Sequence, residues 1–307
     1  MKMVFIHIPI ALLLLFSFSS SVFAQKNSEV LIYVTAESEK NGLVKGLKAE
    51  DFEVKYGNVP QTITSFQSKD EPVSIGILFD ISGSMDAKNH SNESKLQLFL
   101  DGLKKFVDSG NDANEYFLAV FNEKMNFVVD KTQSRDVVIK GLEALRELKT
   151  EGNTNFYDAV NVGLKKLSTA KHMRRVLLIV SDGTDNSSKT SFDDIKKTLR
   201  TTEVLLYSVS PKVHGFSSIY GDGGSAFLDE IIFSSGGRAF YEDKPEKITA
   251  VFERISSEIQ NQYTIGFVPS SQKTGKWTKL KVAIKLPKNS GDQSGKISVR
   301  YRYGFVY

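Results

Sequence analysis

One stretch constrains the fold of this chain more than any other, residues 73–86, which read VSIGILFDISGSMD. Its mostly apolar first half predicts a strand buried on both faces, as the strands of parallel sheets are. The run stops at Asp80, and Ser82 and Ser84 follow at alternate positions. If this turn stays extended, the three side-chain oxygens converge beyond the carboxyl end of the strand, where open α/β sheets bind their ligands. One carboxylate and two hydroxyls are hard oxygen donors, suited to Mg²⁺, Mn²⁺ or Ca²⁺.

From residue 73 to about 260, strand and helix patterns alternate. Short apolar runs at residues 116–121, 174–180 and 204–209 are separated by amphipathic helical patterns, and residues 127–129 are expected to form a short further strand. Such alternation predicts an α/β fold in which helices flank a doubly wound, mostly parallel sheet.

The two ends of the chain are rich in β patterns. Residues 29–70 and 262–307 contain alternating, β-branched and aromatic segments, and each set is too small to enclose a core by itself. We therefore expect one small all-β module built from both ends. The predicted boundaries are an N-terminal β segment at 25–70, an α/β domain at 71–260 and a C-terminal β segment at 261–307.

Residues 1–24 are expected to be a signal peptide. A lysine near the start precedes a largely apolar run, and small residues stand before Gln25, where cleavage is expected. A membrane anchor is the alternative, but the run is short for a span, so we expect no stable membrane span after cleavage. The chain has no cysteine and hence no disulfide. These features favour an exported bacterial protein of the periplasm or the extracellular space.

The charge balance argues against one class of partner. The formal net charge is +4, and we find no basic stripe interleaved with aromatic residues. We therefore expect no nucleic-acid binding.

The D-x-S-x-S pattern of Asp80, Ser82 and Ser84 resembles the metal-ion-dependent adhesion site of von Willebrand factor type A domains. Thr154 stands where the second loop of that family supplies a threonine, and Asp182 where the third loop supplies an aspartate. The resemblance implies a Rossmann-like fold in which these five residues hold Mg²⁺, or Mn²⁺ or Ca²⁺ in its place.

The resemblance also implies a partner and a wider grouping. The cation would bind an Asp or Glu carboxylate of a partner protein, and loops around Met85, Asn155 and Gly183 would contact that partner. The flanking segments DFEV, which contains Phe52, and QYTIGFVP, which contains Tyr263, resemble those of a group of bacterial exported proteins with this domain.

Two other functions stand as alternatives. A Mg²⁺-dependent hydrolase of the haloacid-dehalogenase type needs a second acid two residues after the first aspartate, where this chain has Ser82, and the expected metal loops contain no histidine. We therefore expect a protein without enzymatic activity. The remaining alternative is a structural or assembly subunit of an envelope complex, in which the metal only stabilises the fold.

Four neighbouring residues have simpler expected roles. Thr154 is positioned to cap the helix that begins near Phe156, and Asp158 is expected to be a first-turn carboxylate facing the helix dipole. Asp86 and Asp185 are expected to be solvated turn residues.

Overall fold

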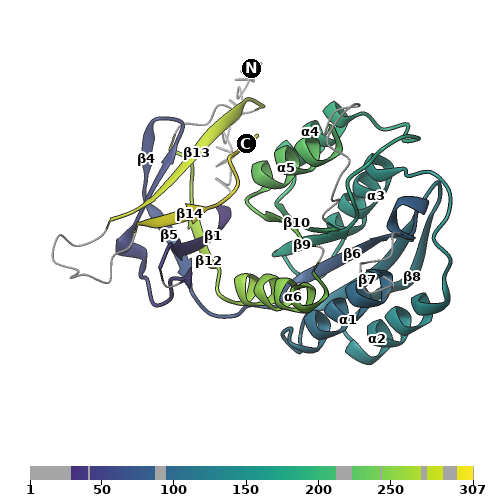
Figure 1. Cartoon of the computed structure of the whole chain (residues 1–307). Helices are drawn as coiled ribbons and strands as arrows, with labels where there is room; N and C mark the ends of the chain where they lie inside the picture. Colours follow the sequence, from purple (N-terminus) through teal and green to yellow (C-terminus); the bar gives the residue numbers. More distant parts are fainter. Residues whose placement is uncertain are drawn as a thin grey trace, which may run out of the picture.

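The structure is a computed structural model that describes residues 29–40, 42–86, 95–211, 223–242, 244–270, 275–285 and 296–306. The predicted signal peptide, residues 1–24, lies outside the described residues, as do His90 and His214. Figure 1 shows an α/β domain with a smaller β module beside it.

The α/β domain is built on a six-stranded sheet with the order β11-β10-β9-β6-β7-β8. Its strands are β6 (Ser74–Asp80), β7 (Glu115–Phe121), β8 (Met125–Thr132), β9 (Arg175–Val180), β10 (Val204–Ser210) and β11 (Arg238–Tyr241). All neighbours pair in parallel except β7 and β8, which are antiparallel. Strand β6 is central, which places Asp80 near the middle of the sheet's carboxyl edge.

Helices cover both faces of this sheet (Figure 1). One face carries α1 (Lys95–Asp108), α2 (Arg135–Ala144) and α6 (Pro245–Gln260), and the other carries α3 (Phe156–Ser168), α4 (Phe192–Thr201) and α5 (Gly223–Ser235). Along β6, Ile77 and Phe79 join the core under α1, whereas Leu78 joins the core under α3. Burial on both faces explains the apolar run, because alternate side chains of a strand point to opposite sides.

The β module draws its strands from both ends of the chain. One sheet has the order β14-β1-β12-β5, with β2 paired to β1, and the other has the order β15-β13-β3-β4. The strands are β1 (Val30–Ser38), β2 (Gly42–Leu43), β3 (Phe52–Tyr56), β4 (Val59–Gln61), β5 (Ile63–Gln67), β12 (Tyr263–Phe267), β13 (Trp277–Ile284), β14 (Ile297–Arg300) and β15 (Gly304–Val306). Residues of both sheets share one apolar core that includes Ile32, Phe52 and Phe267. The architecture confirms the predicted fold class, a mostly parallel α/β sheet with an additional β module.

Two local features differ from expectation. The expected short strand at residues 127–129 is the eight-residue β8, because pairing to β7 extends it in both directions. The amphipathic helical pattern that follows β8 is not one continuous helix but α2 followed by a short 3₁₀ turn, Leu145–Glu147. None of the helices in the described ranges is long and apolar enough to cross a membrane.

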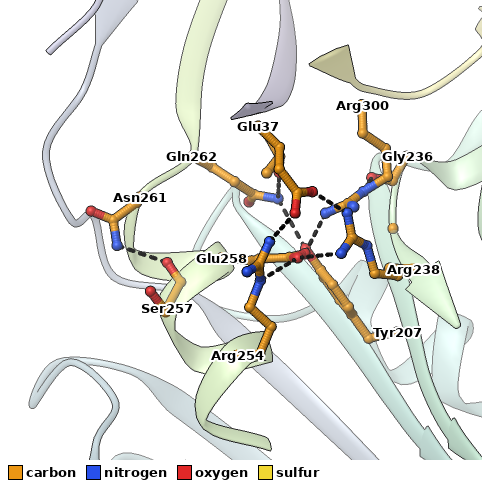
Figure 2. A network of polar contacts seen from close by, with 12 residues as sticks. Glu37, Tyr207, Gly236, Arg238, Arg254, Ser257, Glu258, Asn261, Gln262 and Arg300 are labelled. Carbon is orange, nitrogen blue, oxygen red and sulfur yellow. Dashed lines mark hydrogen bonds and ion pairs between the residues drawn. The ribbon is translucent and has the colours of Figure 1, made fainter. Parts of the chain in front are cut away.

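A cluster of ion pairs joins the module to the α/β domain (Figure 2). Glu258 of α6, whose side chain is fully buried, pairs with Arg254 at 3.1 Å, with Arg238 at 3.3 Å and with Arg300 of the module. Glu37 of the module in turn pairs with Arg238 and Arg254 of the α/β domain. We call these five residues the junction clasp. The ion pairs between the module and the α/β domain can form only when the two are in this arrangement.

Replacing Glu258 with glutamine should strongly destabilise the protein. The change leaves three arginines around one remaining carboxylate, and removal of one partner of a buried ion pair costs about 3–5 kcal/mol. Urea unfolding of Glu258→Gln can be compared with Glu253→Gln, a change at an exposed position of the same helix. Equal unfolding midpoints for the two variants would show that the clasp adds no stability.

Glu37 should make the stability of the clasp depend on pH. Burial alone would raise the pKa of Glu37, but the hydrogen bonds and charges of Arg238 and Arg254 outweigh it and hold the pKa below its ordinary value of 4.5. The stabilisation is therefore complete above that ordinary value and is lost as the pH falls through the lower folded-state pKa. The difference in unfolding free energy between the unmodified protein and Glu37→Gln should be constant near neutral pH and shrink in acid. A difference that grows in acid would contradict this assignment.

Candidate metal centre

Three loops meet at the carboxyl edge of the sheet. The first follows β6, the second precedes α3 at residues 149–155, and the third follows β9 at residues 181–191. Strands β6 and β9 are neighbours, with Phe79 opposite Val180, so the first and third loops leave the sheet side by side. This is the point at which the strand order reverses, where α/β sheets form their ligand crevice.

Asp80 lies at the base of these loops and is completely buried. The backbone N–H of Ser82 donates to its Oδ1 at 2.8 Å, and the Ser181 hydroxyl donates to its Oδ2 at 2.6 Å. Burial raises the pKa of Asp80 to about 6, and the charge of Asp182 adds to that effect, while the bonds from Ser181 and Ser82 oppose it. Among the described residues, no lysine or arginine forms an ion pair with this carboxylate.

Ser82 and Ser84 are close together, although the turn is not extended as expected. Residues Gly83–Asp86 form a 3₁₀ turn, and the hydroxyl oxygens of Ser82 and Ser84 are 3.1 Å apart. Ser82 is buried and Ser84 is exposed, so the two hydroxyls lead from the buried carboxylate towards solvent. The Met85 side chain is buried in the core under α1, so a partner could contact this loop through Ser84 but not through the side chain of Met85.

Backbone hydrogen bonds attach the second loop to the first. The N–H of Glu151 donates to the carbonyl of Ile81 at 2.9 Å, and the N–H of Gly83 donates to the carbonyl of Gly152 at 3.2 Å. Gly152 has φ +82°, a conformation that favours glycine. These bonds hold Thr154 at the same edge of the sheet as Asp80.

Thr154 is buried and connects the second loop to the third. Its N–H donates to Asn186 Oδ1 at 2.8 Å, and its carbonyl accepts from the N–H of Asn186 at 3.1 Å. Thr154 does not cap α3, because the N-cap position is Asn155. The side chain of Asn155 makes no capping bond either, and its Oδ1 is buried without a hydrogen-bond partner.

Asp182 is the second residue of the third loop and is half-buried. Its Oδ1 accepts from the N–H of Thr184 at 2.9 Å across Gly183, which has φ +78°. A side chain at position 183 would be strained in this conformation. The turn thus fixes the backbone on either side of the Asp182 carboxylate.

The donor set fits a hard divalent cation. It comprises two carboxylates and three hydroxyls: Asp80, Ser82, Ser84, Thr154 and Asp182. The described part of the chain contains no group of three or more His, Cys, Asp or Glu side chains that could hold a metal, so hydroxyl oxygens would have to supply much of the coordination. Oxygen-only ligation suits Mg²⁺ and Ca²⁺ rather than zinc. A divalent cation would also supply the positive charge that the buried Asp80 lacks.

Comparison with known proteins assigns the domain. Residues 75–184 match the model of the von Willebrand factor type A domain. The chain contains a von Willebrand factor type A domain. An uncharacterized protein of Borreliella burgdorferi is 23% identical over 135 residues, which span 44% of this chain and only 39% of that relative.

Solved structures resemble this chain in fold. A von Willebrand factor type A protein from Catenulispora acidiphila superposes with a TM-score of 0.50 at 12% identity, covering 92% of this chain and 75% of that one. The PilB minor pilin from Streptococcus sanguinis has a TM-score of 0.48 at 15% identity, covering 64% of this chain and 63% of that one. At such low identities the likeness concerns the fold alone.

The sequence does not reveal the roles of several residues that organise the loops of the von Willebrand factor type A domain. Ser181 holds Asp80, and Asn186 holds Thr154. Asp185, expected to be a solvated turn residue, instead accepts from the N–H of Tyr157 at 3.2 Å. Ser181 could have been noticed because it stands directly after a buried strand. The others could not, since their partners are about thirty residues away in sequence.

Replacing Ser181 with alanine should destabilise the metal-free protein by about 1–3 kcal/mol, because the buried Asp80 carboxylate loses a donor. The matched control is Ser208→Ala on the neighbouring strand β10, where the buried hydroxyl has no hydrogen-bond partner. That control should cost little, since it removes an unsatisfied polar group. Thermal unfolding in the presence of a chelator measures both, and equal losses would contradict the importance of the Ser181 bond.

Proposed function

We propose that this protein binds a divalent cation at Asp80, Ser82, Ser84, Thr154 and Asp182, and through that cation a carboxylate of a partner protein. The observation that carries the proposal is the completely buried carboxylate of Asp80, which is hydrogen-bonded but has no cationic partner among the described residues. A buried, unpaired carboxylate is costly, and a bound cation would offset that cost.

The partner carboxylate follows from the number of ligands. Mg²⁺ takes about six oxygen ligands and usually keeps several waters. The five side chains come from three loops and would supply part of this shell directly and part through water, which leaves a position on the solvent side. When bound, the cation would act as a Lewis acid that holds an Asp or Glu side chain of the partner.

The rim of the site is suited to approach by another protein. Ser84, Thr184 and Asn186 are exposed and uncharged. They can donate hydrogen bonds to a carboxylate without adding negative charge at the rim. The proposed contact surface comprises these residues and the loops around Asn155 and Gly183, with only the backbone near Met85.

Binding, rather than catalysis, is the proposed activity. Position 82, where a hydrolase of the haloacid-dehalogenase type would need its second acid, is a serine that is itself buried beside Asp80. Of the described residues, His172 is the one histidine, and its ring contacts the carbonyl of Ala113 at the opposite end of the sheet. Together with the predicted signal peptide, these features support an exported adhesion or protein-binding module of the bacterial periplasm or exterior.

Calorimetric titration of Mg²⁺, Mn²⁺ and Ca²⁺ into chelator-treated protein tests the proposal. We expect saturable binding at one site, lost in Asp80→Ala and retained in Asp108→Ala, which removes an exposed carboxylate at the far end of α1. A short peptide with one aspartate should bind only when metal is present.

Three outcomes would decide between the alternatives. Metal binding that survives Asp80→Ala would contradict the site. If the unmodified protein binds none of the three ions, with or without the acidic peptide, the result would contradict the proposed function. Metal binding with no affinity for any acidic peptide would instead favour the structural role, in which the ion only stabilises the fold.

A further inference from the structure

The N-terminus of α3 is capped by residues of another loop. Its own N-cap residue, Asn155, makes no capping bond. The first-turn N–H groups are satisfied by the third loop instead: Tyr157 donates to Asp185 Oδ1 at 3.2 Å, and Asp158 donates to Ser188 Oγ at 3.1 Å. Helix termini need such partners because their first N–H groups have none within the helix.

The bonding is reciprocal. The Asp158 carboxylate accepts from the N–H of Lys189 at 3.0 Å and from the N–H of Thr190 at 2.9 Å. Ser188 Oγ also donates to Asp185 Oδ1 at 2.5 Å, which ties the two capping side chains together. Each segment therefore satisfies the backbone donors of the other. Asp158, expected from sequence to act on the helix dipole alone, has specific backbone partners.

Hydrogen bonds such as these, rather than apolar side chains of its own, position the third loop. Residues 181–191 read SDGTDNSSKTS and contain no apolar side chain, so apolar packing by this loop's own side chains cannot fix its position. The bonded residues follow two of the candidate ligands closely in sequence. Thr154 stands three residues before Tyr157, and Asp182 stands three residues before Asp185.

We propose that Asp158, Asp185 and Ser188 are positioning residues that hold Thr154 and Asp182 in one arrangement and thereby set the affinity of the site for its cation. The inference rests on the proposed metal function and adds to it. None of the three residues needs to touch the ion. Their effect is to join the second and third loops into one unit before the metal binds, so that less ordering is required on binding.

The decisive variants are Asp158→Asn and Ser188→Ala. The asparagine presents an NH₂ group to one of the two backbone N–H donors of the third loop, so one bond becomes a clash of donors. Removing groups that orient metal ligands usually lowers metal affinity about 10- to 100-fold, and we expect a loss in this range for Mn²⁺. Ser188→Thr keeps the hydroxyl and should restore most of the affinity.

The matched control is Asp136→Asn. Asp136 is an exposed first-turn carboxylate of α2, so this change removes the same charge from a helix N-terminus without touching the metal loops. The Mn²⁺ affinity of Asp136→Asn should stay within about twofold of that of the unmodified protein. A first-turn charge contributes only about 0.3–1 kcal/mol, and here it contributes to the stability of α2 rather than to the metal site. Titrations well below the unfolding temperature separate lost affinity from lost fold.

Amide hydrogen exchange without metal provides a second readout. Asp158→Asn should speed exchange at Tyr157, Lys189 and Thr190 while leaving the strands β6 and β9 protected, because only the local bonds are broken. Unchanged exchange together with unchanged Mn²⁺ affinity would overturn the positioning role. Equal losses in Asp158→Asn and Asp136→Asn would also overturn it, because they would reflect the removal of a negative charge rather than the loss of the bonds to Lys189 and Thr190.

Metal titration of the unmodified protein and of the variants distinguishes an error in the positioning role from an error in the proposed function. If the unmodified protein binds Mn²⁺ and the variants bind equally well, only the positioning role is wrong. If the unmodified protein binds no metal, with or without the acidic peptide, the proposed function is wrong and the role in metal affinity is wrong with it.

Discussion

The buried carboxylate of Asp80 at the carboxyl end of the central strand is the constraint on which the site depends. Strand β6 has β7 on one side and β9 on the other, and the chain leaves β6 and β9 towards helices on opposite faces of the sheet. A crevice opens where the two connections diverge. Asp80 lies at its base, where two groups donate hydrogen bonds to its carboxylate: the backbone N–H of Ser82, two residues past the end of β6, and the hydroxyl of Ser181, the first residue after β9.

The parts of the structure that could be predicted from sequence are those with a local signal. The apolar runs that end at Asp80 and Val180 are buried on both faces, and such runs are typical of parallel strands. The alternation of strands and helices was enough to predict the doubly wound sheet. The expected strand at residues 127–129 is shorter than β8 because only one of the eight residues of this edge strand is buried, so its sequence lacks a continuous apolar run.

The remaining features depend on pairs that are distant in sequence. Glu37 and Arg254 of the junction clasp are separated by 217 positions, and Asp158 and Thr190 by 32. The sequence does not indicate which donors a single carboxylate will contact. Residues such as Asp185 and Asp158 are therefore assigned their ordinary roles, as a solvated turn residue and as a carboxylate at the helix dipole. Only the fold brings their donors within reach. For the same reason the sequence could suggest the five candidate ligands but not the residues that hold the loops together.

The α/β domain contains two polar networks, the junction clasp and the hydrogen bonds among the three loops, and the two have different roles. The module lies against the amino ends of the strands: Arg174, directly before β9, bonds to Gln262 at 2.8 Å and to the carbonyl of Glu71 at 3.3 Å. The three loops of the candidate metal centre lie at the carboxyl ends of the strands, at the opposite end of the sheet from those contacts (Figure 1). Because charged and hydrogen-bonded contacts demand defined geometry, the clasp restricts the module to one end of the domain. Within the described part of the chain, the β module thus leaves the carboxyl edge uncovered, which is compatible with the proposed binding of a partner carboxylate at that edge.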